Sequence, residues 1–240
     1  MKLFRLSADE SLVRIEQSGE EPKVLPLGNS LLIGGLGFCF VSILVFGIWA
    51  FGGRALSQSL GEGGFYAVLA VAFMGLSGAL FDRLIIGPGT MNRFYALFTV
   101  SFVLYSVLWC AAWFLLAKPL GARVAGLIGA GGTVAMAACF CAGFDHWKPF
   151  VVNAVVLFVA NAVGYFLGDF MSVWFWGDAG ATALENVVSR PTRMMLGKLA
   201  WGLGYGLGFG FGIGYNLYTV QEPVREQLSA RAMRSAESTL

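Results

Sequence analysis

The sequence predicts an all-α integral membrane protein, with about six transmembrane helices in a compact bundle and short polar termini. Apolar residues make up 57% of its 240 residues and charged residues only 12%, and the mean hydropathy is +0.71. The 33 glycines raise the non-polar share further. Soluble domains contain roughly twice as many charged residues, about a quarter of the chain. The composition therefore excludes a disordered chain, a disulfide scaffold and an ordinary soluble enzyme.

The charged residues are distributed very unevenly along the chain. Six apolar stretches of 17 to 26 residues contain only one of them, Asp169. A hydrocarbon core of about 30 Å needs about 20 helical residues, and lipid offers the backbone no hydrogen-bond partners. We therefore expect six spans, at Leu31–Phe51, Phe65–Phe81, Phe94–Ala117, Val124–Phe144, Phe150–Phe175 and Leu199–Val220.

Polar segments flank the predicted membrane domain, 31–220. The tail 1–30 contains Ser7 and Glu10 at capping-box spacing, which favours a short helix over 8–17, although two brief strands also fit. This tail would cap the bundle or dock a partner. The C-terminal tail, 221–240, is predicted to anchor at the membrane surface.

The loop 177–198 is the longest between predicted spans. Thr182 and Glu185 repeat the capping-box spacing, so we expect a helix here that lies on the bilayer surface. Three basic residues of the loop would contact lipid headgroups: Arg190, Arg193 and Lys198.

Aromatic and basic residues indicate how the chain would sit in the membrane. Five tryptophans lie near the ends of predicted spans, as expected of rings at headgroup level: Trp49, Trp113, Trp174, Trp176 and Trp201. Six spans would place ten Lys and Arg residues on the side of both termini and six on the other. The positive-inside rule then predicts cytoplasmic termini in a plasma or inner membrane.

The sixth predicted span alternates glycine with larger residues. On a helix, period two divides into two rows of four-residue spacing about 200° apart, and each row permits close helix packing. One row is Gly202, Gly206, Gly210 and Gly214, and the other is Gly204, Gly208 and Gly212. The alternation resembles the ring-forming helix of rotary ATP synthases and glycine-zipper channel helices, a packing device that implies no shared function. Close neighbours are expected on both faces, either helices of this chain or another subunit.

The fifth predicted span carries a polar stripe at four-residue steps: Asn153, Asn161, Tyr165 and Asp169. A carboxylate within a bilayer is costly, so Asp169 should face protein or water, be paired, or be protonated. One hypothesis is an ion or proton relay, or a site for a polar solute. The alternative is an Asp169 near the headgroups, bonded to a neighbouring span or an interfacial arginine, with the other stripe residues joining helices.

Residues for metal or covalent chemistry are sparse. His146 is the one histidine, which excludes bis-histidine haem and multi-histidine metal sites within one chain. The four cysteines all fall within predicted spans, where they are expected to act as small apolar residues. Neither a nucleophile motif nor a P-loop occurs. We therefore expect no catalytic residue, metal or cofactor, and no nucleic-acid partner.

These observations leave two functional hypotheses. The first is a non-catalytic structural or assembly subunit of a larger membrane complex, whose partners would be the lipid bilayer and other membrane subunits, or further copies of the chain, held by glycine-mediated helix packing. The second is a small transporter or channel for an ion or polar solute, using Asp169 and the polar stripe.

Overall fold

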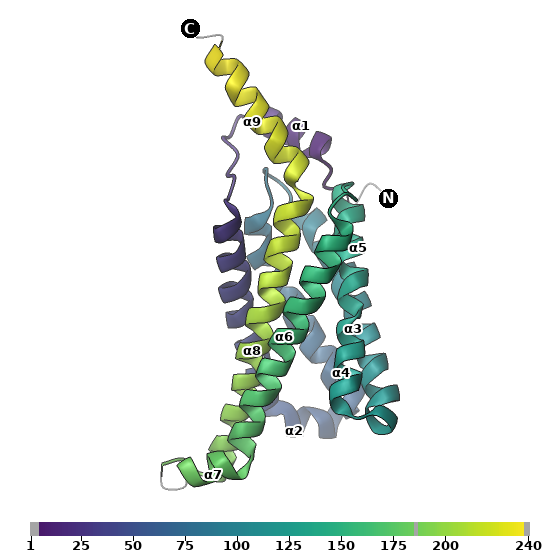
Figure 1. Ribbon diagram of the computed structural model, residues 1–240, viewed down its shortest axis with the longest axis vertical. Helices are drawn as coiled ribbons and strands as arrows, with labels where there is room; N and C mark the ends of the chain where they lie inside the picture. The colour runs from purple at the N-terminus through teal and green to yellow at the C-terminus, as the bar shows by residue number, and fades with distance from the viewer. Residues whose placement is uncertain (1–4, 185–186, 238–240) are drawn as a thin grey trace.

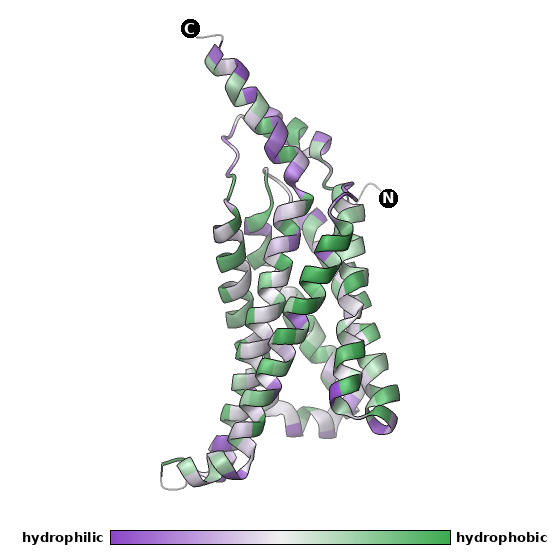
Figure 2. Cartoon of the chain, viewed as in Figure 1, coloured by the Kyte–Doolittle hydropathy of each residue, from purple (hydrophilic) through white to green (hydrophobic). Residues whose placement is uncertain are grey.

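The computed structural model of the protein describes residues 5–184 and 187–237, and every regular element in these residues is a helix (Figure 1). This confirms the all-α class. Four of the described helical segments are long and apolar enough to cross a membrane: Leu27–Leu84, Met91–Leu120, Ala122–Phe144 and Phe150–Trp176. Hydrophilic residues concentrate at the two ends of the bundle (Figure 2).

Helix α2 (Leu27–Phe81) contains the first two predicted spans. The prediction of a loop between them was wrong, because the segment is helical except at Gly61, whose φ of 71° breaks the helix. Glycine adopts this left-handed φ without steric cost. The two halves run antiparallel, since Phe46 contacts Phe73 at a ring-centroid distance of 6.4 Å and Phe38 contacts Phe81 at 5.7 Å.

The short helix η2 (Asp82–Leu84) leads to α3 (Met91–Leu120). The fourth predicted span is divided into α4 (Ala122–Ala130) and α5 (Gly132–Phe144). The junction is at Gly131, whose φ and ψ of −58° and −21° keep the chain nearly helical. Glycines at 126, 129, 131 and 132 lower the local helix propensity, so the division is local and α4 and α5 still follow one path.

Helix α6 (Phe150–Trp176) is followed by α7 (Asp178–Leu184) and α8 (Arg190–Val220). Glu185, half of the second predicted capping box, lies outside the described residues. Placing Arg190, Arg193 and Lys198 in a loop before the last span was wrong, because α8 begins at Arg190. The Ser189 hydroxyl accepts a hydrogen bond from the Thr192 N–H at 3.4 Å, which caps the helix nine residues before Leu199.

Helix α8 packs most extensively against α2 and α6 (Figure 1). The row that starts at Gly202 faces α2, where a Cβ atom at Gly206 would lie 2.7 Å from the Cα atom of Cys39. The row that starts at Gly204 faces α6, where a Cβ atom at Gly204 would lie 2.8 Å from the Cα atom of Gly168. Both rows are therefore covered by helices of the same chain.

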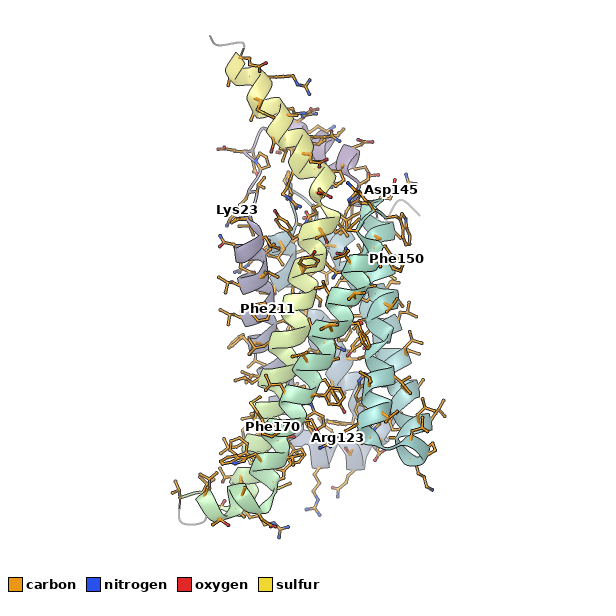
Figure 3. All side chains as sticks on the ribbon, viewed as in Figure 1. Lys23, Arg123, Asp145, Phe150, Phe170 and Phe211 are labelled. Atoms are coloured by element: carbon orange, nitrogen blue, oxygen red, sulfur yellow. The ribbon has the colours of Figure 1, made fainter. Side chains whose placement is uncertain are left out.

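The residues between the glycines also form two rows on α8. One row points into the bundle: Trp201, Tyr205, Phe209, Ile213 and Leu217. The other row points outward, and its Leu203 and Phe211 are exposed (Figure 3). The alternation thus gives α8 four distinct faces, of which two contact helices, one enters the core and one lies on the outer surface.

Helices α1 (Ala8–Ser18) and α9 (Glu222–Glu237) pack together at one end of the bundle. Helix α1 occupies the segment where a helix was expected and begins after Ser7, although the Ser7 side chain makes no capping hydrogen bond. The two helices share a small apolar cluster with the loop after η2: Leu12, Ile15, Ile86 and Val224. The C-terminal tail thus forms a helix that covers this end together with α1.

Candidate ligand-binding pocket

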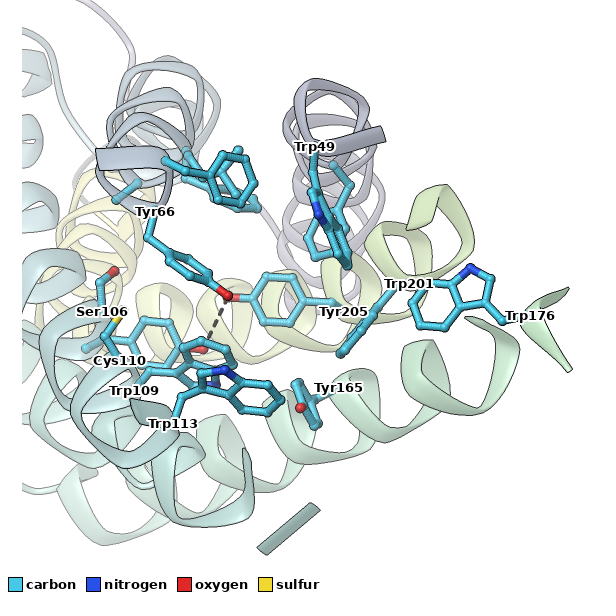
Figure 4. Close-up of a pocket in the computed structure, with 16 residues that line it drawn as sticks. Trp49, Tyr66, Ser106, Trp109, Cys110, Trp113, Tyr165, Trp176, Trp201 and Tyr205 are labelled. Carbon is cyan, nitrogen blue, oxygen red and sulfur yellow. Dashed lines mark hydrogen bonds between the residues drawn. The ribbon is translucent and has the colours of Figure 1, made fainter. Parts of the chain in front are cut away.

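Figure 4 shows a cavity of about 390 Å³, whose lining residues lie toward the end of the bundle opposite α1 and α9 in Figure 1. Both halves of α2 line it, together with α3, α6 and α8. Its lining residues are Phe46, Trp49, Phe65, Tyr66, Leu69, Ala70, Phe73, Tyr105, Ser106, Trp109, Cys110, Trp113, Tyr165, Trp176, Trp201 and Tyr205. We call this cavity the aromatic pocket, because twelve of these sixteen side chains are aromatic.

The pocket contains five of the seven tryptophans and four of the seven tyrosines in the chain. Four tryptophans predicted to lie at headgroup level, at positions 49, 113, 176 and 201, line it. Trp174, the fifth, is 40% exposed. None of the described lining residues is charged. The walls therefore suit an apolar or aromatic molecule.

The rings hold one another in place across helix boundaries. Trp201 of α8 contacts Trp49 of α2 at 5.9 Å and Trp176 of α6 at 6.0 Å, both in edge-on geometry. On α3, Trp109 and Trp113 stack in parallel at 5.4 Å. Such ring pairs contribute about 0.5–1.5 kcal/mol each beyond the area they bury. The hollow is thus bounded by rings that already support one another.

A polar spot lies deep in the pocket. The hydroxyls of Tyr105 and Tyr205 are 3.2 Å apart and share a hydrogen bond, shown dashed in Figure 4. Asn161 lies beside the Tyr105 hydroxyl, and its Oδ1 atom is buried without a hydrogen-bond partner in the described structure. An unpaired buried acceptor is costly, but Asn161 does not line the pocket, so the Tyr105–Tyr205 hydroxyl pair is the polar group that a bound molecule would meet.

The predicted polar stripe of α6 separates into three parts. The Asn153 side-chain oxygen accepts a hydrogen bond from the Thr219 hydroxyl at 2.6 Å. The Asn153 backbone carbonyl accepts a second one, from the side-chain amide of Asn216. Tyr165 lines the pocket, whereas Asn161 lies beside the Tyr105 hydroxyl and is not a lining residue. Asp169 is paired with Arg123 at 3.6 Å, and the Arg123 side chain is 78% exposed. The pairing of Asp169 with an arginine near a helix end is one of the two arrangements the sequence left open.

The three predicted headgroup-binding residues lie on the first turns of α8. Arg190 is exposed. An Arg193 guanidinium nitrogen donates to the Gly177 carbonyl at 3.1 Å, which ties α8 to the end of α6. The Lys198 ammonium lies 4.8 Å from the ring centroid of Trp49, a pocket residue. Lys198 alone of the three therefore adjoins the pocket.

Sequence reasoning did not single out Tyr66, Trp109 or Tyr205 as site residues. A signal for two of them was present in the four-residue spacing of large rings: Tyr105, Trp109 and Trp113 on α3, and Trp201, Tyr205 and Phe209 on α8. Such a stripe marks one helical face, but it is equally typical of a filled core. The presence of a cavity follows only from how the two faces meet.

The described residues contain no group of three His, Cys, Asp or Glu side chains that could bind a metal ion. The four cysteines are free thiols. Comparison with protein-family models, with curated proteins and with solved structures found no match to this chain.

Proposed function

We propose that the protein spans a lipid bilayer and binds a small lipophilic molecule in the aromatic pocket. The observation that carries this proposal is a hollow of about 390 Å³ with almost entirely apolar walls, at the meeting point of the longest helices. Pockets of about 300–1,000 Å³ with apolar walls and few polar groups are typical of small-molecule sites. The Tyr105–Tyr205 hydroxyl pair supplies polar groups of this kind.

A bilayer location is supported by the outer surface of the bundle. Along α6, outward-facing side chains are large and apolar, and Val151, Val163 and Phe170 are each at least 60% exposed. Phe170 and Phe211 project from the bundle in Figure 3. A continuous apolar surface of this kind is unfavourable in water and favourable against lipid tails.

The helices can cross the bilayer six times. The two halves of α2 make two crossings, α3 makes one, α4 and α5 together make one, and α6 makes one. Helix α8 supplies the sixth, because it has no charged residue from Leu199 to Val220. An even number of crossings places α1 and α9 on the same side, as their packing requires. The excess of Lys and Arg on that side favours a cytoplasmic location for both.

The two hypotheses drawn from the sequence, a subunit of a membrane complex and an ion path through Asp169, are less well supported than a pocket for an apolar molecule. The glycine rows of α8 suggested a subunit of a larger complex, but α2 and α6 cover both rows, so the rows give no reason to invoke a partner. An ion path through Asp169 receives no support from the pocket, because Asp169 does not line it and is paired with Arg123. The pocket instead favours binding or transport of an apolar molecule.

The test uses a photoreactive fatty alcohol, carrying a diazirine, in phosphatidylcholine nanodiscs that contain the full chain. Mapping of the labelled residues should show saturable labelling on α3 near Trp109 and on α8 near Tyr205. Ala70→Phe, which places a ring in the hollow, should reduce this labelling several-fold. The matched control is Val159→Phe, on the lipid-facing side of α6. Unsaturable labelling that is equal in the two variants would overturn the proposal.

A further inference from the structure

A basic residue adjoins the apolar pocket. Lys198 lies on the third turn of α8, and its ammonium donates a hydrogen bond to the Trp49 carbonyl at 3.3 Å. The same ammonium lies over the Trp49 ring at 4.8 Å. Trp49 contacts Trp176 and Trp201, which also line the pocket. The positive charge therefore lies at the edge of the cluster of three tryptophans.

Lys198 has no acidic partner within the described residues. Among the described acidic residues at this end of the bundle, none pairs with Lys198: Asp169 is paired with Arg123, and Glu62 and Asp178 are exposed. Lys198 itself is only partly exposed and is enclosed on one side by a ring and a carbonyl. A partly desolvated cation without a counter-charge is a favourable site for an anion.

The surrounding helix ends hold this charge in place. The Trp176 indole N–H donates to the Met194 carbonyl at 3.1 Å, which joins the end of α6 to the start of α8. Gly197, the residue before Lys198, permits this approach, since a side chain there would collide with the Trp176 ring. The ammonium is therefore held on an ordered edge of the pocket.

We propose that the ligand of the aromatic pocket is an anionic amphiphile, with its hydrocarbon in the pocket and its carboxylate or phosphate group on Lys198. This inference rests on the proposed function and adds the charge of the ligand to it. Aromatic walls alone would equally suit a quaternary ammonium group, which binds ring faces. The Lys198 charge over the Trp49 ring disfavours a cation there and favours an anion.

The experiment measures competition against the photoreactive fatty alcohol in the same nanodiscs. Three unlabelled competitors share one hydrocarbon chain and differ in headgroup: stearate, stearyl phosphate and stearyltrimethylammonium. Stearyl alcohol serves as the neutral reference. Stearate, stearyl phosphate or both should displace the probe at about tenfold lower mole fraction than stearyl alcohol, the effect of one charge-assisted contact. The one that displaces more strongly identifies the headgroup as carboxylate or phosphate.

Variants separate the role of Lys198 from that of the pocket. Lys198→Gln should bring both anions to the level of stearyl alcohol and leave probe labelling intact, whereas Lys198→Arg should keep the preference. Lys118→Gln, an exposed lysine near the same end, is the control. Equal displacement by all headgroups, or strongest displacement by the ammonium compound, would overturn the anionic ligand while the pocket stands. Absence of saturable labelling would overturn both proposals.

Discussion

The two ends of the bundle share helix α8 but are closed in opposite ways. At the polar end, formed by α1, α9 and the 82–90 segment, buried hydrogen bonds and ion pairs close the structure. At the aromatic end, formed by the pocket residues, large rings meet edge to face and leave a hollow. The difference shows that one helix can support an end closed by polar contacts and an end with a ring-lined hollow, depending on which side chains face its neighbours.

Gln221 is the central residue of the polar end. It is 1% exposed and accepts a hydrogen bond from the Ile86 N–H at 2.7 Å. Its amide also donates to the Leu84 and Leu217 carbonyls. At the same end, Arg93 pairs with Glu10 at 2.7 Å. Gln221, which directly follows α8, thus pairs the Ile86 N–H and the Leu84 carbonyl, two backbone groups that burial would otherwise leave unsatisfied.

The largest expected effect comes from Gly206→Leu, between the two ends. A Cβ atom there would lie 2.6 Å from the Ser42 Cβ atom, so α2 and α8 would have to separate. We expect a loss of about 3 kcal/mol of stability or more, measured as the thermal unfolding midpoint of the purified protein, with both ends affected. Gly47→Leu is the control, because a Cβ atom at Gly47 meets nothing within 4 Å. Equal midpoints for the two variants would show that α8 does not depend on close contact with α2.

Gln221→Leu should affect the polar end alone. The variant leaves the Ile86 N–H and the Leu84 carbonyl unpaired, which should cost about 2 kcal/mol. Hydrogen exchange should quicken in the 82–90 segment and stay unchanged near Trp109. Gln227→Leu, an exposed residue on α9, provides the control. Faster exchange at both ends would mean that the ends unfold as one unit.

The fold was largely predictable from the sequence, and the pocket was not. Charge exclusion placed the ends of α6 within one residue, because a charged side chain in an apolar helix is costly wherever the helix lies. The helical conformation of the residues on both sides of Gly61 was missed, since polar residues between two apolar stretches are compatible with either a loop or a helix. The hollow depends on how Trp109 of α3 and Trp201 of α8 are brought together in the fold. These helices are distant in sequence, so no local sequence pattern specifies the hollow.

Tyr105→Phe should have a smaller effect, confined to the aromatic end. It removes one hydroxyl of the 3.2 Å pair and deprives the Tyr205 hydroxyl of its partner. We expect a loss of about 1 kcal/mol. The double variant Tyr105→Phe/Tyr205→Phe should lose less than the sum of the two single variants, because the pair can be broken only once. Strict additivity in thermal unfolding would show that the two hydroxyls do not interact.

The smallest expected effect concerns the ion pair at the edge of the aromatic end. Asp169→Asn should change stability by less than about 0.5 kcal/mol, because Arg123 is 78% exposed and exposed pairs contribute little. The double-variant cycle with Arg123→Gln, measured by thermal unfolding at low and high salt, should give a small coupling that salt reduces further. A coupling above about 2 kcal/mol, insensitive to salt, would mean that Asp169 is enclosed as a buried charge. In that case the relay hypothesis for the α6 stripe would regain support, and loss of proton flux in Asp169→Asn liposomes would be its next test.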